Sequence, residues 1–301
     1  MGGRLSVYAI AHSSRHRYPA VAQRSRNEVR LQPRKTAAQR LERFHLEVTP
    51  DAELSSSVDY FGNAVWLVSV EAPHLELVIT AHSEVRVMVT PEVRLDRPWE
   101  RDRLARDPAL EFTLPSPRVP RLPAIAELAR TLEVEAGDGA ALYQAMGRIP
   151  EHLAYLRGAT SVMTSVADVL ERRVGVCQDF AHVMLALCRY LGWPARYVSG
   201  YWVPGEDLGT LESHAWVEVA TPEGEWVGLD PTYATAVRDH HVSAAIGRDY
   251  DDAAPLNGVF VAAEPGETPE VEVVIRPLPD LPPRTGEGKE PRGGGAAWSL
   301  Q

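Results

Sequence analysis

The sequence predicts an α+β protein in which an N-terminal antiparallel β domain precedes a core of helices and strands. Two observations support this prediction. Residues 4–95 contain short runs in which apolar and polar side chains alternate, separated by turn residues, as in an antiparallel sandwich or half-barrel. From residue 122 onward, apolar residues recur at helical spacing, and further alternating runs follow.

The β domain is expected to span residues 1–95. A turn is predicted at residues 59–63, because Gly62 and Asn63 can adopt positive φ angles between two alternating runs. The alternating runs that predict its strands lie at residues 44–48, 65–70, 75–80 and 85–89.

A polar, Pro-rich connector is expected at residues 96–121, and a catalytic core at residues 122–276. The clearest helix covers residues 177–191, where apolar side chains recur every three or four positions until Gly192 and Pro194 end the pattern. The other predicted elements of the core are helices at 123–132, 139–157 and 165–172 and strands at 195–202, 213–220 and 225–230. The tail, residues 277–301, is rich in Pro and Gly and is expected to be disordered.

Composition excludes several classes of protein. With 31 Lys plus Arg against 41 Asp plus Glu, the net charge is −10, which argues against a general nucleic-acid-binding protein. No run approaches the 18 apolar residues of a membrane span, so no membrane partner is expected. Two cysteines cannot form a disulfide scaffold or a four-thiolate metal site. The N-terminus does not resemble a signal peptide, and we expect a cytoplasmic protein of unknown oligomeric state.

Cys177 is the first candidate catalytic residue, because it lies where a loop enters the clearest helix. The first amide groups of a helix have no intrahelical partners, and the helix dipole favours negative charge there, so a thiolate is stabilised. The same amides can donate to an oxyanion that forms beside the sulfur. Cys188 lies on the apolar face in the middle of the helix and is expected to serve in packing.

His214 and Asp230 are the candidate base and orienting group. They lie on two alternating runs that a Pro/Gly turn joins into a hairpin. If Ala220 pairs with Gly224, His214 lies directly opposite Asp230 on the same face of the hairpin. The carboxylate could then bind one imidazole nitrogen and leave the other for the thiol, although a slip of one residue would separate the pair.

Several ordered motifs resemble the transglutaminase-like superfamily, and in particular bacterial transglutaminase-like cysteine proteases. The resemblance covers roughly residues 5–276, including the N-terminal segments 16–18, 27–34 and 59–63 and the later segments 245–250 and 258–260. The motifs that carry it are 175–182 (Gly-Val-Cys-Gln-Asp-Phe-Ala-His), 191–201 (Leu-Gly-Trp-Pro-Ala-Arg-Tyr-Val-Ser-Gly-Tyr), 213–219 (Ser-His-Ala-Trp-Val-Glu-Val) and 226–232 (Trp-Val-Gly-Leu-Asp-Pro-Thr).

The resemblance implies a papain-like core with Cys177 as nucleophile, His214 as general base and then acid, and Asp230 as its orienting group. It further implies acyl transfer at a peptide or isopeptide amide through a thioester, with a peptide or protein substrate. No metal or organic cofactor is expected, because thiolate and imidazole perform the chemistry. Peptidase or amidase action is favoured over transamidation. A non-catalytic peptide-binding or assembly module that retains the fold is the alternative.

Animal transglutaminases use an upstream Trp as second oxyanion donor, but residues 100–192 contain none. Tyr143, Tyr155 and Gln178 are therefore the alternatives for that role.

Four other sites receive weaker interpretations. Asp179 and His182 are interpreted as groups near Cys177 that either support the site or stabilise the fold, and residues 248–250 as part of a substrate rim. His240 and His241 lack metal-ligand partners at the usual spacing and are interpreted as a surface loop.

Overall fold

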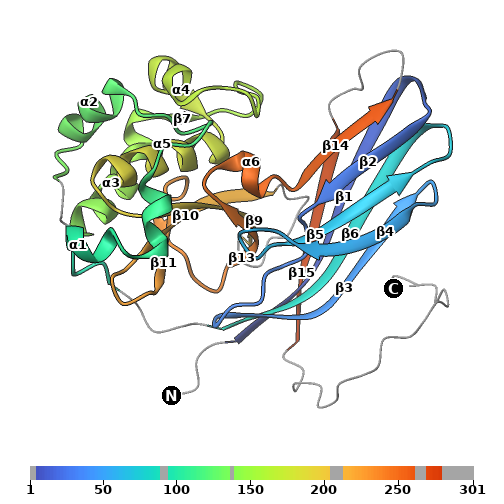
Figure 1. The fold of residues 1–301 in the computed structure, drawn as a ribbon, viewed down its shortest axis with the longest axis horizontal. Helices are drawn as coiled ribbons and strands as arrows, with labels where there is room; N and C mark the ends of the chain where they lie inside the picture. Colours follow the sequence, from blue (N-terminus) through green and yellow to red (C-terminus); the bar gives the residue numbers. More distant parts are fainter. Residues whose placement is uncertain (1–4, 89–93, 136–138, 204–212, 262–268, 280–301) are drawn as a thin grey trace.

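The computed structural model describes residues 5–88, 94–135, 139–203, 213–261 and 269–279. These residues form a β sandwich and, beside it, an α+β core in which helices cover a separate sheet, the core sheet (Figure 1). The α+β prediction and the antiparallel arrangement of the sheets are confirmed.

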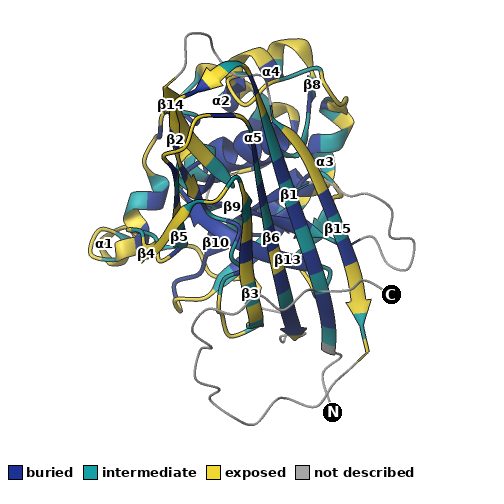
Figure 2. Ribbon diagram, turned by 90° about the vertical axis from the view of Figure 1, so that its right-hand side faces the viewer, coloured by how far each residue is buried: buried dark blue, intermediate teal, exposed yellow. Residues whose placement is uncertain are grey.

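The first sheet of the sandwich has the strand order β15-β1-β6-β3. Its strands are β1 (Leu5–Ala22), β3 (Gln39–Thr49), β6 (His74–Met88) and β15 (Glu270–Leu278). The alternating runs at 75–80 and 85–89 belong to one strand, because residues 81–84 continue the pairing with β1. Figure 2 shows the central strands β1 and β6 largely covered, whereas β3 and β15 at the margins expose more surface.

The second sheet of the sandwich has the order β14-β2-β5-β4. Its strands are β2 (Arg24–Val29), β4 (Glu53–Val58), β5 (Ala64–Val70) and β14 (Leu256–Val261). The predicted turn joins β4 to β5, and Gly62 has a φ of 81°, which glycine adopts without steric cost. The carboxylate of Asp59 closes the turn by accepting from the backbone amides of Phe61 and Asn63.

The chain's last two described strands belong to the sandwich. β14 pairs with β2 and β15 pairs with β1, so residues 256–278 lie outside the α+β core (Figure 1). The expected core of residues 122–276 is therefore too long at its C-terminal end. Burial of Val273 and Ile275 explains this placement, because these side chains of β15 join an apolar cluster between the first sheet of the sandwich and strands β9 and β13 of the core. Pro277 and Leu278 end β15, whereas residues 280–301 of the expected tail lie outside the described residues.

The connector wraps between the two parts of the protein. Phe112, which is 7% exposed, places its ring 6.2 Å from Phe61 of the sandwich and 5.3 Å from Trp226 of the core. The connector contains the short helices α1 (Arg101–Leu104) and η1 (Pro108–Thr113).

The helical layer contains α2 (Pro123–Thr131), α3 (Gly139–His152), α4 (Val166–Arg172) and α5 (Cys177–Tyr190), with the short parallel pair β7 (Ala154–Tyr155) and β8 (Val174–Gly175). Helix α5 is buried continuously from Gln178 to Cys188, because it lies between the other helices and the core sheet. Within the described part of the chain, none of the helices has the length and apolar character needed to cross a bilayer.

The core sheet has the order β12-β11-β10-β9-β13. Its strands are β9 (Ala195–Trp202), β10 (His214–Ala220), β11 (Trp226–Asp230), β12 (Thr235–Ala236) and β13 (His241–Gly247), and α6 (Tyr250–Ala253) follows. The hydrophobic side of this sheet packs on α5, in one cluster that extends to the other helices. The predicted strands at 195–202, 213–220 and 225–230 correspond to β9, β10 and β11.

The sandwich closes the outer edge of β13. The side-chain amide of Asn63 accepts from the backbone N–H of Ile246 at 2.8 Å and donates to its carbonyl at 2.7 Å. Gln39 makes the same pair of bonds to Ser243, both at 2.8 Å. Each amide therefore replaces a neighbouring strand, and an edge that would otherwise carry unpaired backbone groups is satisfied.

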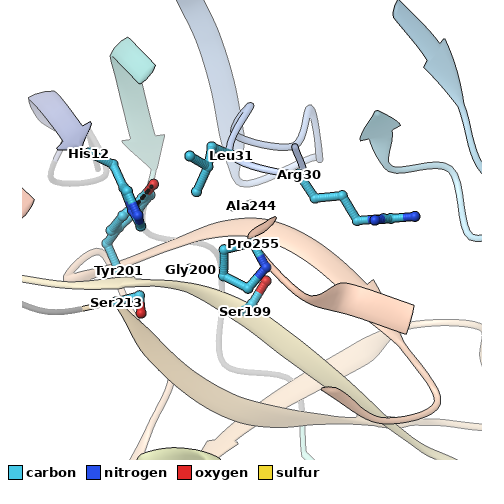
Figure 3. A pocket seen from close by; sticks show the side chains of 9 residues that line it. All are labelled: His12, Arg30, Leu31, Ser199, Gly200, Tyr201, Ser213, Ala244 and Pro255. Carbon is cyan, nitrogen blue, oxygen red and sulfur yellow. Dashed lines mark hydrogen bonds between the residues drawn. The ribbon is translucent and has the colours of Figure 1, made fainter. Parts of the chain in front are cut away.

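A buried polar chain also crosses the boundary between the two parts. Figure 3 shows His12 of β1 directed at the hydroxyl of Tyr201 on β9, and their Nδ1 and Oη atoms are 3.2 Å apart. Burial lowers the pKa of His12 to about 4, so the imidazole is neutral at physiological pH.

Replacement of Asn63 by alanine should destabilise the protein, because it leaves the N–H and C=O groups of Ile246 without these partners. We expect a loss of about 1–3 kcal/mol in the free energy of unfolding, measured by urea denaturation. Asn257→Ala, at an exposed position of β14, is the control and should change it by less than about 0.5 kcal/mol. Equal effects of the two substitutions would show that Asn63 does not close the β13 edge.

Candidate active site

Cys177 is the first residue of α5 and is partly exposed. The loop before it is fixed by Asp179, whose Oδ2 accepts from the backbone N–H of Val176 at 2.8 Å and from the Thr160 hydroxyl at 2.6 Å. The amides of Asp179 and Phe180 donate to the carbonyl of Val176, so the amides of Cys177 and Gln178 are the ones that can donate to an anion beside the sulfur.

Gly175 permits the close approach of this loop to the helix. A Cβ atom at Gly175 would lie 2.7 Å from the Cβ of Asp179 and 3.0 Å from its Oδ2. A larger residue would therefore displace the carboxylate that holds the loop, and with it the start of α5.

His214 lies at the beginning of β10 and is 7% exposed. Its Nε2 donates to Oδ2 of Asp230 at 2.7 Å. The carbonyl of Ser213, the residue before it, accepts from the thiol of Cys177 at 4.0 Å, so the thiol lies beside the imidazole. Since Nε2 is occupied by Asp230, Nδ1 is the ring nitrogen left for the thiol. The structure thus brings all three predicted residues together.

Asp230 ends β11 and is fully buried. Its Oδ2 accepts from His214 and from Nε2 of His241 at 3.1 Å, and its Oδ1 accepts from the backbone amides of Thr232 at 2.9 Å and Tyr233 at 3.3 Å. Burial alone would raise the pKa of this carboxyl group, but the hydrogen bonds from His214 and His241 outweigh it and hold the pKa well below its usual range. Asp230 is therefore ionised at neutral pH.

The imidazole of His214 is correspondingly easy to protonate. Burial disfavours the charged ring, but the hydrogen bonds to Asp230 and Cys177 outweigh this cost and raise the pKa of His214 to about 9. An imidazolium at neutral pH is the partner that a thiolate nucleophile requires.

The hairpin that carries His214 and Asp230 differs in register from the prediction. Ala220 pairs with Trp226 and not with Gly224, a shift of two residues. The turn is longer than expected, since Gly224 has a φ of 88° and Thr221 pairs with Glu225. Because side chains alternate with a period of two, the shift keeps Asp230 on the face of His214, as its diagonal neighbour.

His241 is a member of the site that sequence reasoning missed. It was expected in a surface loop, but it begins β13, is 5% exposed and binds Asp230. The mostly apolar run that follows it, residues 242–247, is a signal for a buried strand and could have placed it in the sheet.

Two aromatic residues beside His214 were also missed. The rings of Trp202 and Tyr233 are stacked, with centroids 4.0 Å apart and planes inclined by 22°. The Tyr233 ring lies 5.2 Å from His214, and this residue is 48% exposed, so it lies at the mouth of the site. Partial burial, together with the nearby groups of Tyr155, Asp230 and Cys177, raises the pKa of Tyr233 to about 12.

The other candidates have structural partners. His182 is buried, which lowers its pKa to about 3, and it accepts from the backbone amide of Tyr250. Asp249 is 1% exposed and accepts from the amides of Arg118 and Asp251, so it caps α6 and does not form a substrate rim. Burial raises the pKa of Cys188 to about 12, in agreement with a packing role.

Gln178 donates to the carbonyl of Val162 at 3.3 Å. Tyr155 pairs with Gly175 in the β7–β8 pair, and Gly175 lies two residues before Cys177 in the chain. Tyr143 packs partly buried against the core.

His214, Asp230 and His241 also form a cluster whose potential ligand atoms lie within 4.8 Å of one another. Both imidazole Nε2 atoms are hydrogen-bonded to the same carboxylate oxygen. A cation bound among them would therefore break both hydrogen bonds, and the arrangement is better suited to orienting His214 than to holding a metal.

Comparisons with known proteins cover both parts of the chain. Residues 8–86 match the bacterial transglutaminase-like N-terminal region, and residues 126–231 match the core of the transglutaminase-like superfamily. An uncharacterised protein of Mycobacterium leprae is 35% identical over 262 residues, which cover 83% of this chain and 92% of that protein. One of Mycobacterium tuberculosis is 34% identical over 291 residues, covering 90% and 93%.

Two further proteins are similar over different extents. A protein-glutamine gamma-glutamyltransferase of Pseudomonas aeruginosa is 34% identical over 135 residues, covering 41% of this chain and 20% of that protein. The crystal structure of a protein from Cytophaga hutchinsonii, described as a "putative cysteine protease", superposes with a TM-score of 0.74 at 21% identity and covers 93% of each chain. This likeness confirms the predicted fold.

Gly175→Ala should displace Asp179 and destabilise the protein by about 1–3 kcal/mol, because the added methyl group overpacks the start of α5. Chemical denaturation measures the effect. Gly147→Ala is the matched control, since a Cβ there meets nothing within 4 Å, and alanine should stabilise helix α3 by about 0.5–1 kcal/mol. If Gly175→Ala is as stable as wild type, the close approach does not constrain the loop.

Proposed function

Since this chain belongs to the transglutaminase-like superfamily, we propose that it is an enzyme that catalyses cysteine-dependent acyl transfer at amide bonds of peptides or proteins. The observation that carries the proposal is the arrangement of Cys177, His214 and Asp230, in which a buried carboxylate binds one nitrogen of the imidazole and the thiol lies beside the ring, bonded to the carbonyl of Ser213. This arrangement supports the proposal, because an activated nucleophile needs a base beside it and a third group that orients the base.

In the proposed first half-reaction, the Cys177 thiolate attacks the carbonyl carbon of an amide. The C=O π electrons move to the oxygen, and amides at the start of α5 stabilise the oxyanion. As the intermediate collapses, imidazolium His214 gives its Nδ1 proton to the leaving nitrogen. Ammonia or an amine departs, and a thioester on Cys177 remains.

In the second half-reaction, a nucleophile attacks the thioester carbonyl. His214, now neutral, accepts the proton of a water molecule or of a primary amine through Nδ1. The C–S bond breaks and returns the electron pair to sulfur, which regenerates the thiolate–imidazolium pair. Water yields a carboxylic acid, and an amine yields a new amide. Asp230 stays ionised through both halves and stabilises the imidazolium.

Hydrolysis is the outcome that we favour, as a peptidase or amidase. Transamidation is the second candidate, and the similarity to the gamma-glutamyltransferase of Pseudomonas aeruginosa supports it. Both outcomes share the thioester and differ only in the nucleophile that reaches it.

A non-catalytic peptide-binding or assembly module is the competing proposal. A retired enzyme commonly loses a member of its triad, whereas here all three residues are present, with His214 bound to Asp230 and Cys177 bound to the carbonyl of the adjacent Ser213. This difference favours the enzyme.

We also propose that the substrate is a peptide or protein and that the protein acts in the cytoplasm. The negative net charge of −10 supports a partner other than nucleic acid. Both cysteines are free, and a reducing compartment would keep the thiolate usable.

A covalent adduct tests the proposed nucleophile. We expect that wild-type protein incubated with a peptide pool from a bacterial lysate, and quenched in acid, carries a hydroxylamine-labile acyl adduct on the Cys177 peptide in mass spectra. Cys177→Ala should carry none. Undiminished amide cleavage by this variant would exclude Cys177 as the attacking residue, and release of ammonia without amine incorporation would distinguish hydrolysis from transfer.

Asp230→Ala should slow formation of that adduct by a factor on the order of 10²–10⁴, because the imidazole loses its orienting partner. The loss of activity must occur while circular dichroism and the melting curve still show a folded protein. Asp251→Ala, at an exposed position of α6, is the control and should react at the wild-type rate. A wild-type rate for Asp230→Ala would refute the orienting role.

A further inference from the structure

We infer that His241 is a positioning residue of this site, a second histidine that holds Asp230 in the orientation in which it aligns His214. The inference rests on the proposed function and extends it to a residue outside the Cys177–His214–Asp230 triad. Its basis is a shared oxygen atom. Nε2 of His214 and Nε2 of His241 both lie within hydrogen-bonding distance of Oδ2 of Asp230, at 2.7 and 3.1 Å.

The hydrogen bonds around His241 define its role as a donor. The ring Nδ1 of His241 accepts from the backbone N–H of Arg238 at 3.4 Å. The backbone N–H of His241 donates to the carbonyl of Arg238 at 3.0 Å. With Nδ1 as acceptor, the neutral imidazole carries its proton on Nε2 and donates it to Asp230. Burial lowers the pKa of His241, which favours this neutral form.

The charged and titratable groups that act on His241 are few within the described residues. Asp230 from β11 binds it, His214 from β10 lies with its ring centroid 6.3 Å away, and His240 is its neighbour in the chain. The ring of Trp216 contacts it edge-on at 5.2 Å. His241 therefore lies in an apolar and histidine-lined setting in which Asp230 is its hydrogen-bonding carboxylate.

The position of His241 depends on β13, which is bonded to β9 on one side and to the sandwich on the other. On one side His241 pairs with Trp202 of β9. On the other side the side-chain amides of Gln39 and Asn63 bind the backbone of β13. The sandwich thus contributes to placing the residue that restrains Asp230, although it supplies none of the three proposed catalytic side chains.

This restraint has a chemical consequence during turnover. The backbone amides of Thr232 and Tyr233 hold Oδ1 of Asp230, while Oδ2 is held by the two histidines. His214 must change its protonation state in every cycle, whereas His241 keeps its proton on Nε2. The proton that His214 gains and loses is on Nδ1, so its Nε2 stays bound to Oδ2 while the charge of its ring alternates. His241 is therefore a second donor to Oδ2, and its own charge does not change during the cycle.

The test uses the rate at which iodoacetamide alkylates Cys177, measured on the full chain by peptide mass spectrometry from pH 5 to 9. Leucine at position 241 has no donor, whereas a glutamine amide nitrogen can occupy the place of Nε2. We expect His241→Leu to slow alkylation at pH 6 by about 3- to 10-fold, the effect of one lost hydrogen bond, and to move its onset to higher pH. His241→Gln should remain within about twofold of wild type.

A double substitution separates positioning from general structural support. If His241 acts through Asp230, His241→Leu should change the rate by less than about twofold in an Asp230→Ala background, because coupled residues are not additive. An equal slowing in both backgrounds would overturn the inference. Should His241→Leu fail to fold, His241→Asn serves instead: its shorter amide cannot reach Asp230, so it should be slow where His241→Gln is fast.

The outcome also distinguishes this inference from the proposed function. Wild-type protein that reacts no faster than His214→Ala would contradict the proposed function itself. Wild-type protein that reacts faster than His214→Ala, but at the same rate as His241→Leu, would leave the function standing and overturn the role of His241.

Discussion

The buried carboxylate of Asp230 is the group on which the geometry of the site depends. A charge with no exposure to solvent is costly unless hydrogen bonds compensate it, and here the donors are two imidazoles and two backbone amides. They come from β10, β13 and the segment after β11, which meet at one end of the core sheet. Satisfying Asp230 therefore fixes these segments relative to one another, and Cys177 lies against the imidazole thus oriented.

The two parts of the protein serve the same site by different means. Helix α5 presents Cys177 at its N-terminus and is buried between sheet and helices, so the thiol has a rigid support. The sandwich satisfies the outer edge of β13 with side-chain amides, and its own sheets are completed by β14 and β15, which follow the core in sequence. The core segment of the chain is therefore preceded and followed by strands of the sandwich, which hold both of its ends.

Local patterns predicted much of this arrangement from sequence. Apolar periodicity predicts helix α5, strand β9 and the shared face of His214 and Asp230 on the hairpin. The predicted register was wrong by two residues, but the two side chains still share a face because side chains alternate with a period of two. Long-range pairing was not predictable in this way. The partners of β14 and β15 lie more than 200 residues away, and His241 binds Asp230 through a sheet order that no local pattern encodes. Trp202 and Tyr233 are likewise brought together by tertiary structure.

Asp230 and Cys177 together hold His214 as an imidazolium at neutral pH. An NMR titration of the His214 imidazole in ¹³C,¹⁵N-labelled protein tests it most directly, with assignment from His214→Gln. We expect a pKa of about 9 for His214 in the wild-type protein and a lower pKa in both Cys177→Ala and Asp230→Ala. A pKa at or below the ordinary histidine value of about 6.5 in wild type, unchanged by those substitutions, would contradict it.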